Sequence, residues 1–219
     1  MIELPFLIIF PAIAAVLLLF IANETLRNAV VKIAALLIGA GTIYAFFTYF
    51  QSGLQLFSVP FEPASQIMFV LELFIALYIL YVGIQCRRYL AVLLIIIQSA
   101  LLIYVESVFV MGIHPEFNLF IDQFSLIMAM IIGIIGTLIC VYALRYMQTY
   151  HAHHPEIKDR RRLFFFMFFV FLSGMFGLIF SNNLLWVFFF WEITTLCSFI
   201  LIFFFFKQKT AYEIVFGDW

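Results

Sequence analysis

Residues 181–202 read SNNLLWVFFFWEITTLCSFILI, an apolar run long enough to cross a bilayer as a single helix. One carboxylate, Glu192, lies near its middle, and the run contains no Lys or Arg. Counted from Leu184 at about 1.5 Å per residue, Glu192 lies about 12 Å into a hydrocarbon layer of about 30 Å. An ionisable side chain at that depth is costly and indicates a functional site. We therefore interpret Glu192 as an intramembrane proton relay.

The side chains predicted to lie near Glu192 on the same helix are mostly apolar, and include Phe188, Phe189 and Phe199. Their desolvating effect favours the protonated form of the carboxyl. Thr195 carries a hydroxyl one turn further along the helix. That hydroxyl could orient the Glu192 carboxyl, or it could satisfy its own helix backbone, and the sequence leaves both interpretations open.

The composition of the chain identifies a membrane protein. Of its 219 residues, 67% are hydrophobic and 11% are charged, and the mean hydropathy is +1.18. A soluble domain is excluded by several spans of 18 or more nearly uncharged residues. The net charge of −1, with no basic cluster outside the segments that flank the membrane, gives no reason to expect a nucleic-acid partner.

Cysteine and histidine spacing gives no sign of a metal centre. Cys86, Cys140 and Cys197 lie far apart, and no Cys or Cys/His spacing typical of zinc or an iron–sulfur cluster occurs. Three histidines in the run HAHH at 151–154 lack a completing ligand set, and a solvated loop is the favoured interpretation. We expect this chain to hold no metal and no cofactor, so that any redox groups belong to other subunits.

The apolar runs predict an all-α, polytopic bundle of about seven spans. Glu72 in the third span is a candidate second relay, whereas Glu106 near the end of the fourth is expected to be solvated. Asp122 is expected to cap the fifth span. Gly174 and Gly177 are expected to give the sixth a small-residue face. The predicted spans cover residues 2–22, 29–50, 66–85, 89–111, 119–144, 163–180 and 181–202.

Charge placement predicts the orientation of the spans. Lys and Arg occur around the connections after spans one, three, five and seven, as in Arg27, Arg87 and Arg160, but not in the other connections. This asymmetry puts the N-terminus outside and the basic loops, 145–162 being the longest, in the cytoplasm of a cell membrane. No span is expected to carry a basic residue at depth, so a cationic partner for Glu72 or Glu192 is expected to come either from another subunit or from a part of the protein missing from this chain.

Three blocks resemble the antiporter-like membrane subunits of respiratory complex I, of group 4 membrane-bound hydrogenases and of multisubunit cation/proton antiporters. They are FNLFIDQFSLIM at 117–128, YALRYM at 142–147 and the block at 181–202 with its Trp191-Glu192 pair. The resemblance implies that Glu192 matches the glutamate that pairs with a lysine two helices further on and gates proton transfer. That lysine and the later helices of the family are not in this chain, which resembles an N-terminal part.

The resemblance also suggests a division of the chain. Residues 1–50 hold two helices, 51–111 a linker and an extra hairpin, and 112–202 the three helices of the family core. The extra hairpin is expected to pack at the edge of the bundle. The tail 203–219, which changes sharply in composition at KQKTAYEIVFGDW, is expected to be a sequencing artefact.

The resemblance implies a proton-translocating subunit of an energy-converting complex of the NADH-quinone oxidoreductase or hydrogenase type. The alternative is a subunit of a cation/proton antiporter without a redox partner. The expected partners are the lipid bilayer, other membrane subunits, and protons or Na⁺. A purely structural membrane subunit with solvated acids is the third possibility.

Overall fold

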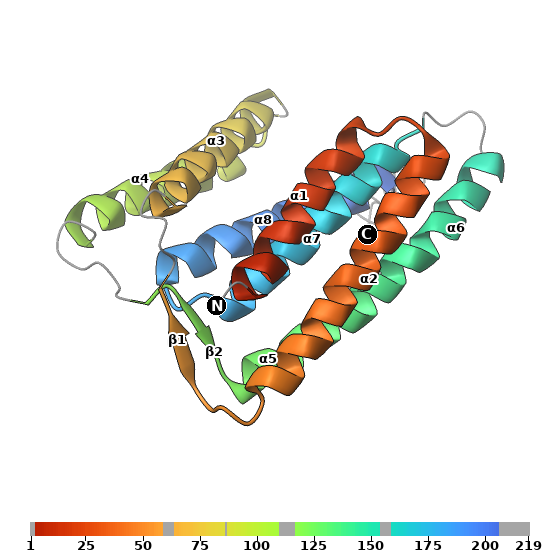
Figure 1. Ribbon diagram of the computed structural model, residues 1–219. Coiled ribbons are helices and arrows are strands. Elements are labelled where there is room, and N and C mark those ends of the chain that lie inside the picture. The colour runs from red at the N-terminus through yellow and green to blue at the C-terminus, as the bar shows by residue number, and fades with distance from the viewer. Residues whose placement is uncertain (1–2, 59–63, 86, 110–116, 154–158, 206–219) are drawn as a thin grey trace, which may run out of the picture. The chain divides into compact units, whose positions relative to one another are not determined.

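The computed structural model describes residues 3–58, 64–85, 87–109, 117–153 and 159–205 (Figure 1). The chain divides into two compact units, one formed by residues 1–56 with 120–219 and the other by residues 57–119. In chain order the elements are α1 (Glu3–Phe20), α2 (Glu24–Tyr49), β1 (Gln55–Phe57), α3 (Ala64–Gln85), α4 (Tyr89–Phe109), β2 (Leu119–Ile121), α5 (Gln123–Met130), η1 (Ile131–Gly136), α6 (Thr137–His153), α7 (Arg161–Phe180) and α8 (Leu184–Phe205).

The expected all-α membrane bundle is confirmed. Because α5, the π-helix η1 and α6 follow one another without a break, the described residues form seven successive helical rods. Five segments are long and apolar enough to cross a membrane, and α1 and α4 contain shorter apolar stretches, Leu4–Phe20 and Tyr89–Val105. The chain is therefore a multi-pass membrane protein.

The start of α2 differs from the sequence prediction. Residues 23–28 were expected to form a polar loop, but α2 begins at Glu24, because the side chain of Asn23 accepts hydrogen bonds from the backbone N–H groups of Thr25 (2.9 Å) and Leu26 (3.3 Å). Arg27 and Lys32 consequently lie within the helix. The assignment of Arg27 to a loop was therefore wrong, whereas the expectation that no span carries a basic residue at depth remains a prediction.

The connection between the fifth and sixth spans is also shorter than expected. The sequence predicted a polar loop over 145–162, but α6 continues to His153 and α7 begins at Arg161. Arg145 lies within α6, where its Nη1 donates to Oε1 of Gln148 at 3.4 Å. Polar residues on α6 therefore extend the helix beyond its apolar part instead of ending it.

The fifth span begins later than predicted. Residues 119–121 form the strand β2, which pairs with β1 in a two-stranded sheet, and the helix starts only at Gln123. Asp122 is its N-cap, with a carboxylate oxygen accepting from the Ser125 backbone N–H at 2.7 Å while Ser125 Oγ accepts from the Asp122 N–H at 2.9 Å. This reciprocal pair is a capping box, so the predicted capping role of Asp122 is confirmed.

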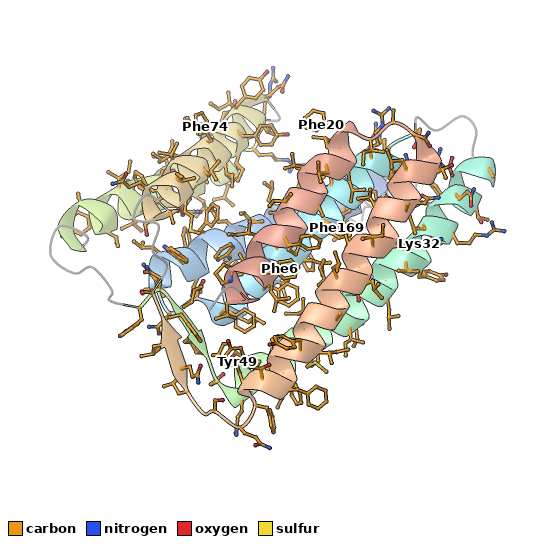
Figure 2. All side chains as sticks on the ribbon, in the orientation of Figure 1. Phe6, Phe20, Lys32, Tyr49, Phe74 and Phe169 are labelled. Carbon is orange, nitrogen blue, oxygen red and sulfur yellow. The ribbon has the colours of Figure 1, made fainter. Side chains whose placement is uncertain are left out.

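Within the larger unit, α7 is the central helix. It packs along α1 on one side and α8 on another, and it also contacts α5, η1 and α6 (Figures 1 and 2). Its side chains Phe165, Phe169 and Phe176 are fully buried, whereas Phe20 of α1 is exposed. The hydroxyl of Ser173 donates to the backbone oxygen of Ile8 at 2.6 Å and joins α7 directly to α1.

A second close contact joins α2 to the π-helical turn. Gly133 lies so close to Thr42 of α2 that a Cβ on the glycine would collide with the threonine side chain. The hydroxyl of Thr42 donates to Ile38 O at 2.7 Å, and Thr137 Oγ1 donates to Gly133 O at 2.5 Å. Small residues thus allow these helices to approach closely, and each buried hydroxyl is satisfied by its own helix.

The smaller unit is the hairpin of α3 and α4. Arg87, with a φ of 54°, ends α3, and the N–H of Arg88 donates to Gly83 O at 2.9 Å. A Cβ on Gly83 would lie 3.0 Å from Val92 Cγ2, so the two helices are in close contact there. The packing of this hairpin at the edge of the bundle and the four-part division of the chain remain predictions, and the tail 206–219 lies outside the described residues.

Candidate functional site

The site is built on α8, which starts directly after a short turn from α7. Asn183 holds this start, since its Oδ1 accepts from the Leu185 N–H at 3.0 Å and its backbone oxygen accepts from the Val187 N–H at 3.0 Å. Helix α8 then runs for 22 residues, about 33 Å, which is sufficient to cross the hydrocarbon layer of about 30 Å.

One face of α8 packs against α7, as the glycine pair of α7 predicts. A Cβ on Gly174 would lie 3.0 Å from Thr194 Cγ2 and 3.2 Å from Ile193 Cγ2, and a Cβ on Gly177 would overlap the ring of Phe190. The same face includes further buried side chains, namely those of Trp186 and Cys197. The predicted small-residue face of α7 is therefore the surface that fixes the rotation of α8.

This rotation turns Glu192 away from α7. Residues 190 and 194 pack on α7, and Glu192 stands two positions from each, about 200° around the helix. Its side chain is half-buried, and its Oε2 atom is enclosed by protein. From the first residue of α8, Glu192 is about 12 Å along the helix axis. The structure thus places a partly buried carboxyl at membrane depth, on the side of α8 opposite the helix that supports it.

The phenylalanines expected to surround the carboxyl have different environments. Phe189 is buried, but Phe188 and Phe199 are exposed by 37% and 59% in this chain. These two lie on the same side of α8 as Glu192, together with Thr195. Two of the three phenylalanines are therefore exposed in this chain, on the side of α8 that carries Glu192. Another part of the assembly or lipid can pack on them and so help to cover the carboxyl.

The hydroxyl of Thr195 forms a bond to its own helix. It donates to the backbone oxygen of Trp191 at 2.9 Å, and Thr194 donates to the same oxygen at 2.8 Å. This geometry corresponds to the second sequence interpretation, in which the Thr195 hydroxyl satisfies its own helix backbone. An orienting role of Thr195 toward Glu192 remains a prediction.

Glu72, the second candidate, lies in the hairpin unit. It is the ninth residue of α3, about 12 Å along the helix, and only 4% of its surface is exposed. Its Oε1 atom is enclosed, on the same helix as the buried residues Ala76 and Gly83. Glu72 belongs to the smaller unit and Glu192 to the larger one.

The other candidate residues from the sequence, namely Glu106, the histidines and the cysteines, add no further site among the described residues. The side chain of Glu106 and the whole of His154 lie outside the described residues. Cys140 and Cys197 are free and buried in the helical bundle. Within the described part of the chain, no group of three or more His, Cys, Asp and Glu side chains is arranged to hold a metal ion.

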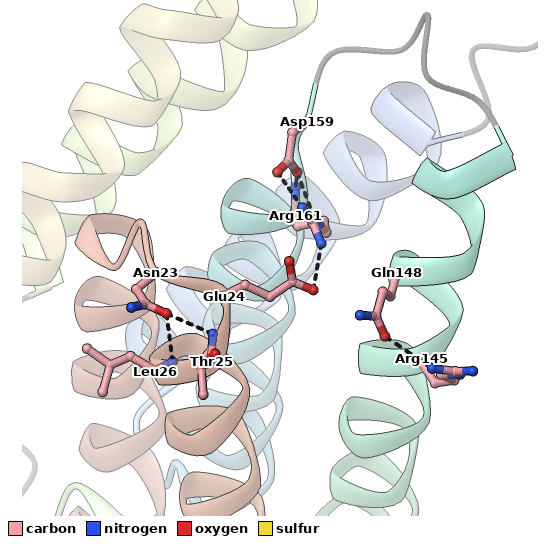
Figure 3. Close-up of polar contacts among 8 residues, drawn as sticks. All are labelled: Asn23, Glu24, Thr25, Leu26, Arg145, Gln148, Asp159 and Arg161. Atoms are coloured by element: carbon pink, nitrogen blue, oxygen red, sulfur yellow. Dashed lines mark hydrogen bonds and ion pairs between the residues drawn. The ribbon is translucent and has the colours of Figure 1, made fainter.

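A cluster of charged side chains at one end of the bundle was not predicted from the sequence. Arg161 at the start of α7 forms an ion pair with Glu24 at the start of α2, with 3.0 Å between Nη1 and Oε1, and it also binds Asp159 (Figure 3). Beside it, Arg27 is only 2% exposed. Asn23 followed by an acidic first turn is a recognisable helix-start signal that would have placed Arg27 inside α2.

The comparisons with known proteins agree with the class that the fold defines, a polytopic helical membrane protein. The family described as "NADH-Ubiquinone oxidoreductase (complex I), chain 5 N-terminus" matches residues 108–166. The chain is 32% identical over 131 residues to the chloroplastic NAD(P)H-quinone oxidoreductase subunit 5 of Lepidium virginicum, covering 53% of this chain and 16% of that one.

Other relatives have the same description. The identity is 36% to the protein of Draba nemorosa and 35% to that of Tecoma stans, each over 97 residues, covering 44% of this chain and 12% of the relative. The chain thus spans at most about a sixth of the length of these relatives.

The family resemblance seen in the sequence is confirmed: over part of its length the chain is similar to the antiporter-like membrane subunits of complex I. The matched residues 108–166 contain two of the three blocks that carried the resemblance, at 117–128 and 142–147. The match ends before α7 is complete, so it does not include Glu192.

Proposed function

We propose that this chain is the N-terminal part of a proton-translocating membrane subunit of a complex of the NAD(P)H-quinone oxidoreductase type. The family match and the names of the relatives support this assignment over a hydrogenase or a stand-alone cation/proton antiporter. The subunit would work in the lipid bilayer beside other membrane subunits, and the redox groups would be theirs.

Glu192 is the residue to which we assign proton transfer. The observation that supports the assignment is a half-buried carboxyl at membrane depth, directed away from α7. Desolvation by the surrounding apolar side chains holds a proton on such a group, and a cationic side chain approaching it favours ionisation. Alternation between these two environments would take up a proton from one side and release it to the other. Protons are the proposed ion, with Na⁺ as the alternative.

Two further residues have supporting roles in this proposal. Thr195 lies one turn from Glu192, and its hydroxyl can accept a hydrogen bond from the protonated carboxyl while donating to Trp191 O. Glu72 is a second buried carboxyl in a membrane-length helix and is proposed as an additional relay. The orientation we propose, with the N-terminus outside and the basic loops in the cytoplasm, rests on the distribution of Lys and Arg.

Substitution of Glu192 in the full-length subunit tests the function. Glu192→Gln keeps the shape of the side chain but cannot titrate, so the complex should assemble and lose most of its proton translocation. The measurement is acidification of inverted vesicles, with subunit content determined in parallel. Asp122→Asn is a suitable control, since Asp122 caps α5 and has no proposed relay role. Normal pumping by Glu192→Gln would show that Glu192 is structural.

The choice of complex needs a separate measurement. Purification of the native assembly through a tag on this subunit should recover quinone-reducing subunits. Recovery of hydrogenase subunits, or of small antiporter subunits alone, would instead establish one of the two alternatives.

A further inference from the structure

Arg27 is a buried cation at the end of the larger unit. It lies in the first turn of α2, where its backbone N–H donates to Asn23 O at 2.9 Å, and only 2% of the residue is exposed. Its Nε atom is enclosed and has no hydrogen-bond partner among the residues that the structure describes. A buried guanidinium nitrogen without an acceptor is costly, which indicates that an acceptor binds there.

The neighbouring carboxylates are engaged by another arginine. Both oxygens of Asp159 accept from the side chain of Arg161, at 3.0 Å from Nε and 2.9 Å from Nη2. The remaining terminal nitrogen of Arg161, Nη1, forms the ion pair with Glu24 at 3.0 Å. Among the described contacts, the two acids near Arg27 therefore compensate Arg161 directly, and they act on Arg27 as longer-range charges.

The charge balance of this end is positive. Among the residues that the structure describes, the charges that act on Arg27 are those of Arg161, Arg162, Glu24 and Asp159, so three arginines in all stand beside two carboxylates. The N-termini of α2 and α7, each the positive end of a helix dipole, meet at the same place because the Glu24–Arg161 ion pair joins them. An anion is what this arrangement would attract.

The length of α2 is compatible with a position of Arg27 at the level of lipid phosphates. Helix α2 has 26 residues and a length of about 39 Å, some 9 Å more than a hydrocarbon layer of about 30 Å. If the other end of α2 lies at the opposite boundary of that layer, the first turn of the helix extends into the headgroup region. Basic pockets between helix ends at this level suit lipid phosphates.

We propose that Arg27, with Arg161 and Arg162 beside it, binds the phosphate group of an anionic phospholipid at the joined ends of α2 and α7. The phosphate would accept hydrogen bonds from the guanidinium of Arg27 and balance the excess charge, while the acyl chains would lie along the exposed apolar surface of the helices. The same phosphate chemistry is available from inorganic phosphate, so the test separates the two sources.

The experiment is thermal unfolding of the purified full chain in detergent micelles. Phosphatidylglycerol, phosphatidylcholine or inorganic phosphate is added, and the shift of the Tm is measured for each. We expect phosphatidylglycerol to raise the Tm more than phosphatidylcholine does, and Arg27→Gln to lose most of this difference. Lys32→Gln removes one positive charge from an exposed position on the same helix, and it should keep the difference.

Several outcomes would overturn the proposal. One is an equal response to the two lipids, and another is a phosphatidylglycerol response of Arg27→Gln equal to that of the unmodified chain. A full shift with inorganic phosphate alone would overturn the assignment to a lipid. If Arg27→Gln fails to fold, the phospholipid that co-purifies with the unmodified chain is analysed instead. A lack of enrichment in anionic lipid would then refute the site. Arg27→Lys, which keeps the charge without the guanidinium fork, should retain only part of the enrichment.

Discussion

Phe190 of α8 lies directly over Gly177 of α7, so closely that a Cβ on the glycine would overlap the phenyl ring. This contact fixes the rotation of α8 and, through it, the direction of Glu192 two residues further on. Gly177 therefore helps to position the proposed relay through Phe190 and not through a described contact with the carboxyl.

Gly177→Ala should destabilise the bundle by about 1–3 kcal/mol, because the ring of Phe190 must shift to make room for the new methyl group. Thermal or chemical unfolding in detergent measures the loss. Gly39→Ala is the matched control, since a Cβ there would lie 3.6 Å from its nearest neighbour, Thr137 Oγ1, at ordinary contact distance. A stability equal to that of the unmodified chain for Gly177→Ala would contradict the contact.

Ser173→Ala should weaken the attachment of α1 to α7. The serine hydroxyl donates across the two helices to Ile8 O at 2.6 Å, and a buried bond of this kind contributes about 0.5–1.5 kcal/mol. Ser198→Ala serves for comparison, because Ser198 donates to Thr194 O of its own helix at 2.8 Å. The two variants would be compared by unfolding in the same detergent, and an equal loss would argue against a joining role of Ser173.

The Glu24–Arg161 ion pair should contribute only a small coupling energy. Its side chains are 40% and 18% exposed, so water and salt screen the attraction between them. A double-mutant cycle with Glu24→Gln and Arg161→Gln is expected to give about 0.2–1 kcal/mol, decreasing as salt is added. A coupling energy that is larger and independent of salt would contradict this expectation, because it would mean that water does not reach the ion pair.

The proposed orientation can be tested with reporter cysteines, in a chain whose native Cys86, Cys140 and Cys197 are replaced by alanine. A cysteine in the segment 112–118 should react with an impermeant reagent added outside the cell, and one in 151–158 should react only after the membrane is opened. The basis is the concentration of Lys and Arg around the second of these segments. The reverse labelling pattern would overturn the orientation.

The class of this protein and the approximate position of every span follow from the sequence alone. Apolar runs of membrane length allow only one kind of backbone structure, because a helix satisfies its own hydrogen bonds where no water is available. The capping role of Asp122 was predictable for a similar reason, since an acidic residue before a helical run with a hydroxyl three positions later forms a local structure. The small-residue face of Gly174 and Gly177 could likewise be read from spacing.

Only the tertiary structure decided which side of each helix is buried and at which residue each helix with a polar end begins or ends. Arg27 and Arg145 were assigned to loops because charge is unfavourable in a membrane, yet Arg27 lies within α2 and Arg145 within α6. The direction of Glu192 depends on Phe190 and Thr194 meeting two glycines on another helix. Apolar side chains surround α8 on every side and its few polar residues mark no single packing face, so contact with α7 determines which face is buried.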